Sequence, residues 1–183
     1  MYKYGKLLYD GIQIEQDKEE GLKYIKMAAD NGYPDALYHY SLILDEYNRN
    51  SNEEPAYLKQ AAYKGHIDSM YRYSLHLFDK DKENPSFQKI FIKLTKNASD
   101  KRLKEAINTY SYFLFYGVGI QRNVKLALRY LKIAADEGHI GAMNSYGIQL
   151  YNGENIDADK EEAVYYVKKA ADCGLAAALA NYG

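Results

Sequence analysis

Several residue types are scarce in this chain of 183 residues, and each scarcity narrows the class of protein. The one cysteine, Cys173, cannot form an internal disulfide, which fits a reducing compartment. Because no histidine or basic cluster lies near it in the sequence to activate the thiol, we expect Cys173 to be a small buried residue. No apolar run approaches the roughly 18 residues of a membrane-spanning helix, and the first residues do not form a signal peptide. We therefore expect no membrane segment in this chain and favour a cytoplasmic location.

An excess of one charge is also missing. Lysine and arginine number 24, and aspartate and glutamate number 25, so the formal net charge is -1. Such a balance produces no overall field that would draw the protein to nucleic acid or to an anionic membrane. We expect no nucleic-acid partner.

Tryptophan is absent and phenylalanine occurs five times, whereas tyrosine occurs 21 times. Part of this excess belongs to a repeat, in which a tyrosine followed by glycine or serine returns at intervals of 36, 33, 37, 36 and 36 residues. We call these residues the marker tyrosines: Tyr4, Tyr40, Tyr73, Tyr110, Tyr146 and Tyr182.

A pair of small residues forms a second marker, and its first member always lies 12 residues before a marker tyrosine. The distance from a marker tyrosine to the next pair varies instead, between 21 and 25 residues. A tight turn packed between helices cannot change length, whereas a surface loop can. The constant segment is therefore predicted to be a buried turn and the variable segment an exposed loop. The pairs are Ala28-Ala29, Ala61-Ala62, Ala98-Ser99, Ala134-Ala135 and Ala170-Ala171.

Each repeat is predicted to contain two amphipathic helices. In the first helix, a small residue four positions before the marker tyrosine and a leucine four positions after it share one stripe with the tyrosine, which we expect to face the core. The expected fold class is all-α, an α-solenoid of about five antiparallel helix pairs plus a half-repeat. The expected repeats, in a single domain, are residues 1–33, 34–66, 67–103, 104–139 and 140–175, with a stub at 176–183.

Local signals mark the ends of these helices. A glycine three residues after the small pair is predicted to end four of the second helices, and Arg102 takes its place in the third repeat. Pro55 suggests a late start for the second helix of repeat two. Other second helices are predicted to begin at Asp17 with Glu20 and at Asp159 with Glu162, as capping boxes, and at Asn84 with Pro85.

These patterns together resemble the Sel-like repeat, a relative of the tetratricopeptide repeat. The residues that carry the likeness read Y-G-x-x-L-x-x-G, then Y-x-K-x-A-A-D-x-G-H, then A-x-x-x-Y-G. The likeness covers essentially the whole chain, although the family usually has leucine at the marker tyrosine and an aromatic residue four positions later. It implies a right-handed superhelix that serves as an adaptor or scaffold and binds a protein or peptide.

No residue pattern predicts catalysis, and we expect no catalytic residue, no metal and no cofactor. His66 and His139 follow a turn glycine, but Tyr33 and Leu175 hold the same place elsewhere, which a metal ligand would not allow. A helical-repeat RNA binder is an alternative that would need a positively charged track. The chain could also be the non-catalytic repeat region of a larger enzyme or signalling protein.

The predicted binding surface is a groove along the first helices, which usually line the concave side of a solenoid. Side chains two and one positions before the marker tyrosine, and two and three positions after it, point away from the core stripe. Aromatic residues and arginine among them suit a peptide that runs from repeat two to repeat four. The predicted partner-binding residues are Tyr38, His39, Ile43, Tyr71, Arg72, His76, Thr109, Phe113, Asn144 and Gln149.

Both ends of the chain lie within predicted first helices, whereas solenoids usually carry polar capping segments. We therefore expect a fragment of a longer array, or a chain that can stack end to end with another copy of itself.

Overall fold

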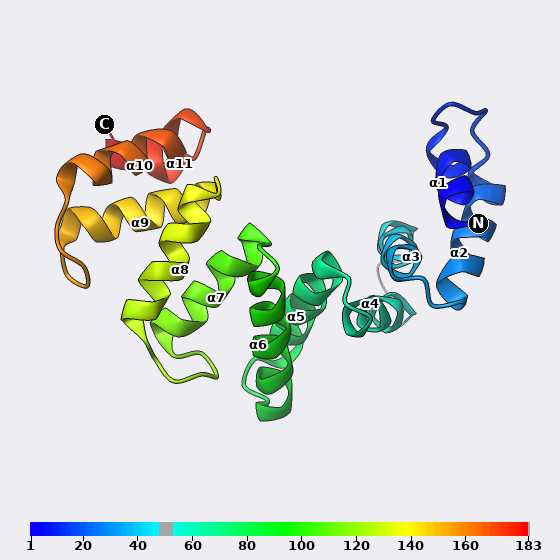
Figure 1. Cartoon of the computed structure of the whole chain (residues 1–183), viewed down its shortest axis with the longest axis horizontal. Coiled ribbons are helices and arrows are strands. Elements are labelled where there is room, and N and C mark those ends of the chain that lie inside the picture. The colour runs from blue at the N-terminus through cyan, green and yellow to red at the C-terminus, as the bar shows by residue number, and fades with distance from the viewer. Residues whose placement is uncertain (48–52, 183) are drawn as a thin grey trace. The chain divides into compact units, whose positions relative to one another are not determined.

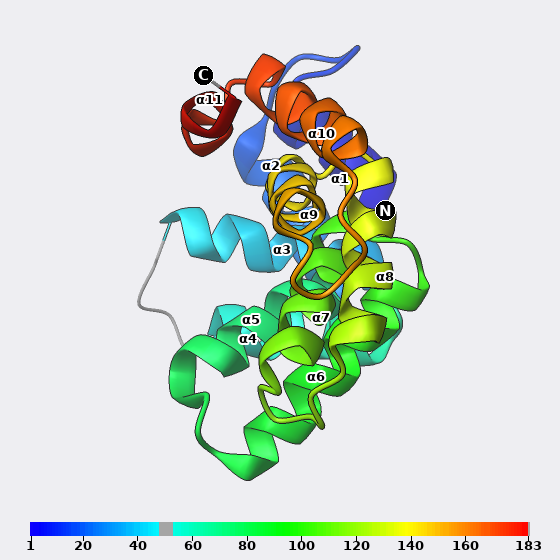
Figure 2. The same cartoon turned by 90° about the vertical axis from the view of Figure 1, so that its left-hand side faces the viewer.

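The computed structural model describes residues 1–47 and 53–182. These residues form eleven helices and no strand, so the predicted all-α class is confirmed (Figures 1 and 2). The helices are α1 (Tyr2–Asp10), α2 (Lys18–Asp30), α3 (Pro34–Tyr47), α4 (Glu53–Tyr63), α5 (Ile67–Asp81), α6 (Pro85–Asp100), α7 (Lys104–Tyr116), α8 (Val124–Asp136), α9 (Ile140–Asn152), α10 (Lys160–Asp172) and α11 (Ala176–Tyr182).

The chain divides into two compact units. Unit 1 is Met1–Lys82 and holds α1 to α5, and unit 2 is Glu83–Gly183 and holds α6 to α11. Within each unit, consecutive helices pack against each other, as α1 does on α2 and α9 on α10 (Figure 1). This stacking of helix pairs is the predicted α-solenoid. The boundary between the units falls inside the third predicted repeat. The predicted bounds of the repeats, and the prediction that all repeats form a single domain, stay predictions.

The turn after each described second helix has the same geometry. One residue in it takes the left-handed conformation, with φ between 69 and 92°: Gly32, Gly65, Arg102, Gly138 and Gly174. Glycine does so without strain, and its position at the end of these helices is as predicted. Arg102 does so at a cost of about 1 kcal/mol. Its amide donates to the Ser99 carbonyl at 2.9 Å, so repeat three keeps the turn that the glycines form elsewhere.

The loop from first to second helix closes in one way in repeats one, four and five. A glycine in the left-handed conformation ends the first helix, and the residue that caps the second helix donates its amide to the carbonyl of the core leucine. These bonds run from Asp17 to Leu8, from Asn123 to Leu114 and from Asp159 to Leu150, at 3.0, 2.8 and 3.1 Å.

The predicted starts at Asp17, Asn84 and Asp159 are confirmed, because each side chain accepts a hydrogen bond from an amide of the first turn at 2.9 to 3.0 Å. The reciprocal half of the predicted capping boxes is wrong. In that half, the glutamate side chain would accept a hydrogen bond from the amide of the capping aspartate. This amide instead donates to the leucine carbonyl of the preceding helix. The structure describes α4 from Glu53 on, with Pro55 inside the helix, and the predicted late start falls at residues 48–52, outside the described part of the chain.

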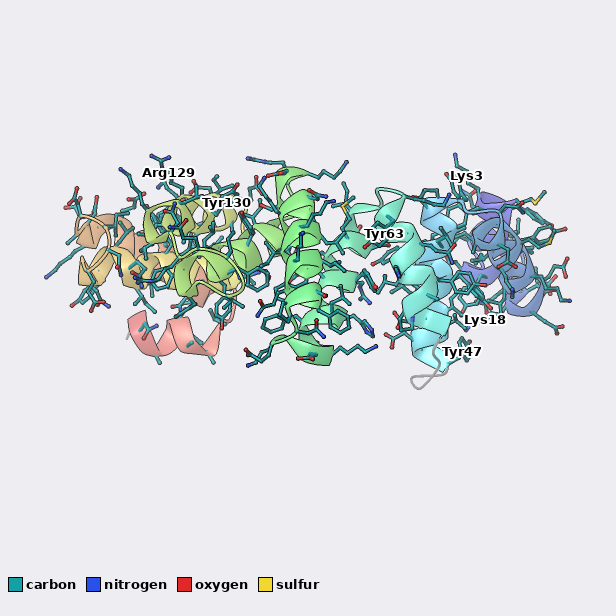
Figure 3. All side chains as sticks on the ribbon, turned by 90° about the horizontal axis from the view of Figure 1, so that it is seen from below. Lys3, Lys18, Tyr47, Tyr63, Arg129 and Tyr130 are labelled. Carbon is teal, nitrogen blue, oxygen red and sulfur yellow. The ribbon has the colours of Figure 1, made fainter. Side chains whose placement is uncertain are left out.

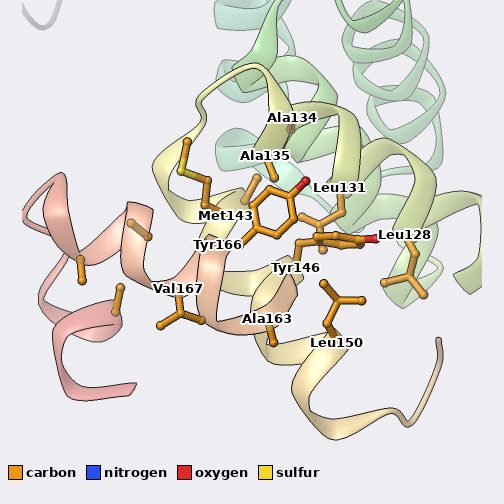
Figure 4. Packing of buried hydrophobic residues seen from close by; sticks show 14 of the residues in the cluster. Leu128, Leu131, Ala134, Ala135, Met143, Tyr146, Leu150, Ala163, Tyr166 and Val167 are labelled. Atoms are coloured by element: carbon orange, nitrogen blue, oxygen red, sulfur yellow. The ribbon is translucent and has the colours of Figure 1, made fainter. Parts of the chain in front are cut away.

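The marker tyrosines of repeats two to five are buried, as predicted, and so are the small residues four positions before them. Tyr146 of repeat five lies in the core of unit 2 with Leu128, Leu131 and Leu150 (Figure 4). Tyr4 contradicts the prediction, since 51% of it is exposed. In later repeats the preceding second helix covers the ring, whereas among the described residues no helix takes that place over Tyr4.

Candidate functional site

Each marker tyrosine of repeats one, two, four and five is paired with a tyrosine of the second helix in its own repeat. The two rings meet edge to face, with centroids 4.8 to 5.3 Å apart and interplanar angles of 77 to 87°, a favourable arrangement for aromatic quadrupoles. The pairs are Tyr4–Tyr24, Tyr40–Tyr57, Tyr110–Tyr130 and Tyr146–Tyr166. Much of the tyrosine excess is therefore structural.

A lysine and an aspartate of the preceding second helix complete this arrangement, which we call a tyrosine joint. Between repeats four and five, the Lys132 ammonium lies 5.0 Å from the centre of the Tyr146 ring and donates to Glu162 Oε1 at 2.6 Å. The Tyr166 hydroxyl donates to Asp136 Oδ1. Burial and this bond raise the pKa of Tyr166 to about 12, so the hydroxyl remains a donor at neutral pH.

The joint between repeats one and two has the same parts. Lys26 lies 5.6 Å from the centre of the Tyr40 ring, and the Tyr57 hydroxyl donates to Asp30 Oδ1 at 2.8 Å. Lysine and aspartate sit two positions before and two positions after the first residue of the small pair, so they share one face of the helix. The sequence pattern K-x-A-A-D carried this signal, but its partner tyrosines could not be identified before the helices were placed.

Tyrosines outside the joints gather at a hollow between the first helices of repeats four and five, which we call the α7/α9 hollow. It has a volume of about 180 Å³. Tyr112 and Tyr116 are largely exposed, and their ring centroids lie 4.7 Å apart, while the Phe115 ring lies 5.0 Å from that of Tyr116. The lining residues are Asn108, Ser111, Tyr112, Phe115, Tyr116, Leu131, Ser145 and Gln149.

The α7/α9 hollow mixes aromatic and polar side chains and is uncharged, since its lining contains no carboxylate, lysine, arginine or histidine. Gln149 is oriented by the Asn155 side chain, whose amide donates to Gln149 Oε1 at 3.0 Å. Aromatic rings beside amide and hydroxyl groups can hold an apolar side chain and pair with a peptide backbone. The serine and tyrosine hydroxyls of the lining have no histidine, lysine or carboxylate among the lining residues to activate them.

A second hollow lies at the equivalent place one repeat further, beside α9, α10 and α11, and we call it the α9/α11 hollow. Ile148 and Tyr151 take the positions of Tyr112 and Phe115, and Asn181 that of Ser145. Its volume is about 490 Å³. Unit 2 thus repeats the same depression between successive first helices.

Of the predicted groove residues in unit 2, only Gln149 lines the α7/α9 hollow. Phe113 is 2% exposed and packs its ring 5.2 Å from that of Phe91, so it belongs to the core. Asn144 is buried and accepts a hydrogen bond from the Asn181 amide at 3.1 Å. Thr109 is half-buried and its hydroxyl donates to the Glu105 carbonyl at 2.9 Å.

The predicted groove residues of unit 1 lie among aromatic side chains. Ile43 is buried, and the other five are half-buried or, like Arg72, exposed. The Tyr38 ring stacks on the His66 imidazole with centroids 4.4 Å apart, and the Tyr2 hydroxyl lies 2.7 Å from His39 Nδ1. Burial lowers the pKa of both histidines, which favours their neutral forms.

Ile43, Phe113 and Asn144 therefore leave the candidate surface, because a partner could not reach them without opening the helix packing. Tyr112 lies in one of the predicted groove columns, two positions after the marker tyrosine, whereas Phe115 and Tyr116 lie outside these columns. Phe115 and Tyr116 lie five and six positions after the marker tyrosine, at the end of α7, and only the shape of the hollow shows that this end of the helix faces the same space.

His66 and His139 have a structural role at the turns. Each is the residue before a first helix, and its Nδ1 accepts a hydrogen bond from an amide of that helix at 3.2 or 3.1 Å. No three His, Cys, Asp or Glu side chains in the described part of the chain gather closely enough to hold a metal ion. Cys173 is exposed rather than buried, because it lies just after the last residue of α10.

None of the helices in the described ranges is both long enough and apolar enough to span a lipid bilayer. No protein with a curated functional description matches the chain. Several solved structures do. A Sel1 repeat protein from Oxalobacter formigenes superimposes with a TM-score of 0.83 and 23% sequence identity, over 98% of this chain and 74% of its own.

Two further structures are similar. The protective antigen c5321 of uropathogenic Escherichia coli strains, described as having an SLR fold, gives a TM-score of 0.83 at 17% identity over 99% of this chain. The chain spans only 39% of that protein. The immunity protein Pa5087 from Pseudomonas aeruginosa gives 0.56 at 14% identity, over 93% of this chain and 66% of its own. At these identities the likeness shows the fold alone.

The family model of the Sel1 repeat matches residues 1–33, 104–139 and 140–175, which is more than half of the chain. These ranges include the three repeats in which the first-to-second-helix loop closes on the core leucine. The chain therefore belongs to the Sel1 repeat family, whose members are typically non-catalytic scaffolds and whose repeats generally mediate protein interactions.

Proposed function

We propose that the chain is an interaction scaffold or adaptor that binds a segment of another protein in the α7/α9 hollow. The observation that carries this proposal is the exposure of Tyr112 and Tyr116, 49% and 64%, beside a depression lined by hydrogen-bonding groups. Exposed aromatic rings in a depression are typical anchors of protein interfaces, because they bury a large area at low entropic cost.

The lining favours an uncharged segment. A charged side chain would lose its hydration in the hollow and find no opposite charge there, which is costly. An apolar or aromatic side chain would stack on the rings, while its backbone could pair with Asn108, Ser145 and Gln149. The proposed ligand is therefore an extended or helical peptide with an apolar anchor.

Of the remaining predicted residues, Tyr38, His39, Tyr71, Arg72 and His76 stay in the proposal as a second contact region on unit 1. Thr109, next to Asn108 in α7, stays as a proposed contact on unit 2.

The test compares a hollow variant with a matched control. Peptides are selected from a displayed random library on the full wild-type chain, and their Kd values are measured by fluorescence anisotropy. The variant Tyr112→Ala with Tyr116→Ala should weaken binding at least about tenfold, or ~1.4 kcal/mol. The control, Tyr63→Ala with Tyr165→Ala, removes two equally exposed rings from the second helices α4 and α10 and should bind like wild type (Figure 3 labels Tyr63).

Equal Kd values for the hollow variant and the control would contradict the proposal. Circular dichroism of both variants checks that they are folded.

RNA binding is the alternative to test alongside. The hollow has no cationic lining, and a helical-repeat RNA binder needs a positive track for the phosphates. We expect no mobility shift of single-stranded RNA at low salt. A shift that disappears as salt is raised would favour the RNA alternative.

A further inference from the structure

The tyrosine joint between repeats four and five shows which groups one repeat uses to pack against the next. Repeat four contributes Lys132 and Asp136 from one face of α8. Repeat five contributes the edge-to-face pair Tyr146–Tyr166 and the carboxylate of Glu162. In this joint, the lysine and the aspartate of repeat four therefore contact the two tyrosine rings and the glutamate of repeat five.

The outer face of repeat five carries the first half of such a joint. Lys168 and Asp172 lie two positions before and two positions after Ala170, as Lys132 and Asp136 lie around Ala134, and both side chains are exposed. The neighbouring apolar position also lacks a cover: Val164 is 49% exposed, whereas its equivalent Leu128 is 5% exposed.

The outer face of repeat one carries the second half. The Tyr4 and Tyr24 rings already meet edge to face, with centroids 5.3 Å apart at 77°, which is the geometry of the internal pairs. Glu20 takes the position of Glu162, four residues before the second tyrosine, and its carboxylate lies 3.5 Å from the Lys23 ammonium of the same helix. The Tyr4 ring is half exposed, whereas Tyr146 in the internal joint is 3% exposed.

We propose that copies of this chain associate head to tail by forming a tyrosine joint between them. Lys168 of one copy pairs with Glu20 of the next and lies over its Tyr4 ring. The Tyr24 hydroxyl donates to Asp172. The two faces are complementary in charge, since one presents a cation where the other presents an anion, and this complementarity is that of the joint inside unit 2.

Helix α1 of the second copy then takes the place of a first helix on α10. By repeat position, α11 corresponds to the first seven residues of α9 and α1 to its last nine, so the two share three positions. Association therefore displaces the last turn of α11. The rest of α1 enters the α9/α11 hollow, whose apolar lining includes Ile148, Val164 and Val167.

This contact joins two different faces, so an open series of copies keeps one unused face at each end. The expected product is a series of oligomers whose average mass rises with concentration. Sedimentation velocity of the full wild-type chain, up to about 1 mM protein, should show this rise. A chain that stays monomeric over that range overturns the proposal.

Charge exchange identifies the faces. Glu20→Lys alone and Lys168→Glu alone each place like charges in the joint and should weaken association at least about tenfold. Mixing the two variants, or combining both changes in one chain, restores an opposite pair and should return association to within about threefold of wild type. The loss and the recovery together identify Glu20 and Lys168 as partners across the contact between copies.

The controls are the adjacent exposed changes Glu19→Lys and Lys169→Glu, which alter net charge equally and should leave association unchanged. Single variants that associate like wild type, or a mixture that does not recover, overturn the assignment. Helical circular dichroism of each variant shows that a loss of association is not a loss of fold.

Discussion

At the scale of the residue, the tyrosines serve two purposes. Tyr40, Tyr110 and Tyr146 are buried in edge-to-face pairs, which join the two helices of a repeat. Tyr112 and Tyr116 are exposed at the α7/α9 hollow, where they are available to a partner. The repeat spacing in the sequence distinguishes the marker tyrosines from the exposed tyrosines, because only buried positions need to recur at a fixed interval.

The histidine caps make the stability of the chain depend on pH. Burial lowers the pKa of His139 from its ordinary value of 6.5, while nearby Glu105 opposes this change and Lys104 adds to it. The unfolded chain therefore binds more protons than the folded chain below about pH 6.5, so stability is complete above that pH and is lost as pH falls through the folded pKa. Protonated Nδ1 also cannot accept the Ala142 amide.

The variant His139→Asn tests this account. Asparagine is a good capping residue that does not titrate, so the unfolding free energy at pH 7 should stay within about 0.5 kcal/mol of wild type. Its loss between pH 7 and pH 5 should be about 0.5 to 1 kcal/mol smaller than in wild type. Urea unfolding at both pH values, at one ionic strength, provides the measurement.

His139→Ala is the control for the cap itself. It should lose about 1 kcal/mol already at pH 7, because alanine offers no acceptor. Equal stability of the alanine and asparagine variants at pH 7 would rule out a capping role for His139.

At the scale of the element, the small residue after each marker tyrosine decides how closely the two helices of a repeat approach. The spacing predicted that this residue must be small. It did not predict in which repeats serine is small enough and in which repeats glycine is required. In repeat five, a Cβ on Gly147 would lie 2.7 Å from Val167 Cγ2 and 2.9 Å from the Ala163 carbonyl oxygen. The Val167 side chain can rotate away, whereas the carbonyl is fixed in α10.

Gly147→Ala should therefore lower the unfolding free energy by about 1 to 3 kcal/mol, because α9 and α10 must separate to admit the methyl group. Gly141→Ala is the matched control in the same helix. Its Cβ would meet only the His139 side chain, at 3.3 Å, so it should be neutral or stabilise by up to about 1 kcal/mol. Thermal or urea unfolding that shows equal effects for both variants would refute this packing argument.

At the scale of the whole molecule, the class of fold was predictable and the binding surface was predictable only in part. Constant and variable spacings distinguish turns from loops, and helical periodicity then defines the core stripe. Neither spacing nor periodicity predicts which residues outside the core stripe are exposed. Phe113 was predicted to face a partner, but the neighbouring α6 covers it, and a covering helix cannot be inferred from positions within α7 alone. The α7/α9 hollow likewise depends on the ends of two helices distant in sequence.

The proposed association uses, between two chains, the same arrangement that the tyrosine joint has inside one chain. A tyrosine joint uses residues that every copy of the repeat can supply, so exposed halves such as Tyr4–Tyr24 keep the geometry of the buried ones. In a solenoid, stability is a sum of repeat and neighbour terms, and an additional neighbour adds the same kind of contact.

Site-specific photo-crosslinking tests the central claim, that the α7/α9 hollow is the protein-binding surface, most directly. A benzophenone amino acid is placed at Tyr112 in one full-length variant and at the comparably exposed Tyr63 in another, and each is irradiated with a library-selected peptide. The account predicts a covalent peptide adduct at position 112 and none at position 63. Crosslinking at position 63 without crosslinking at position 112 would contradict it.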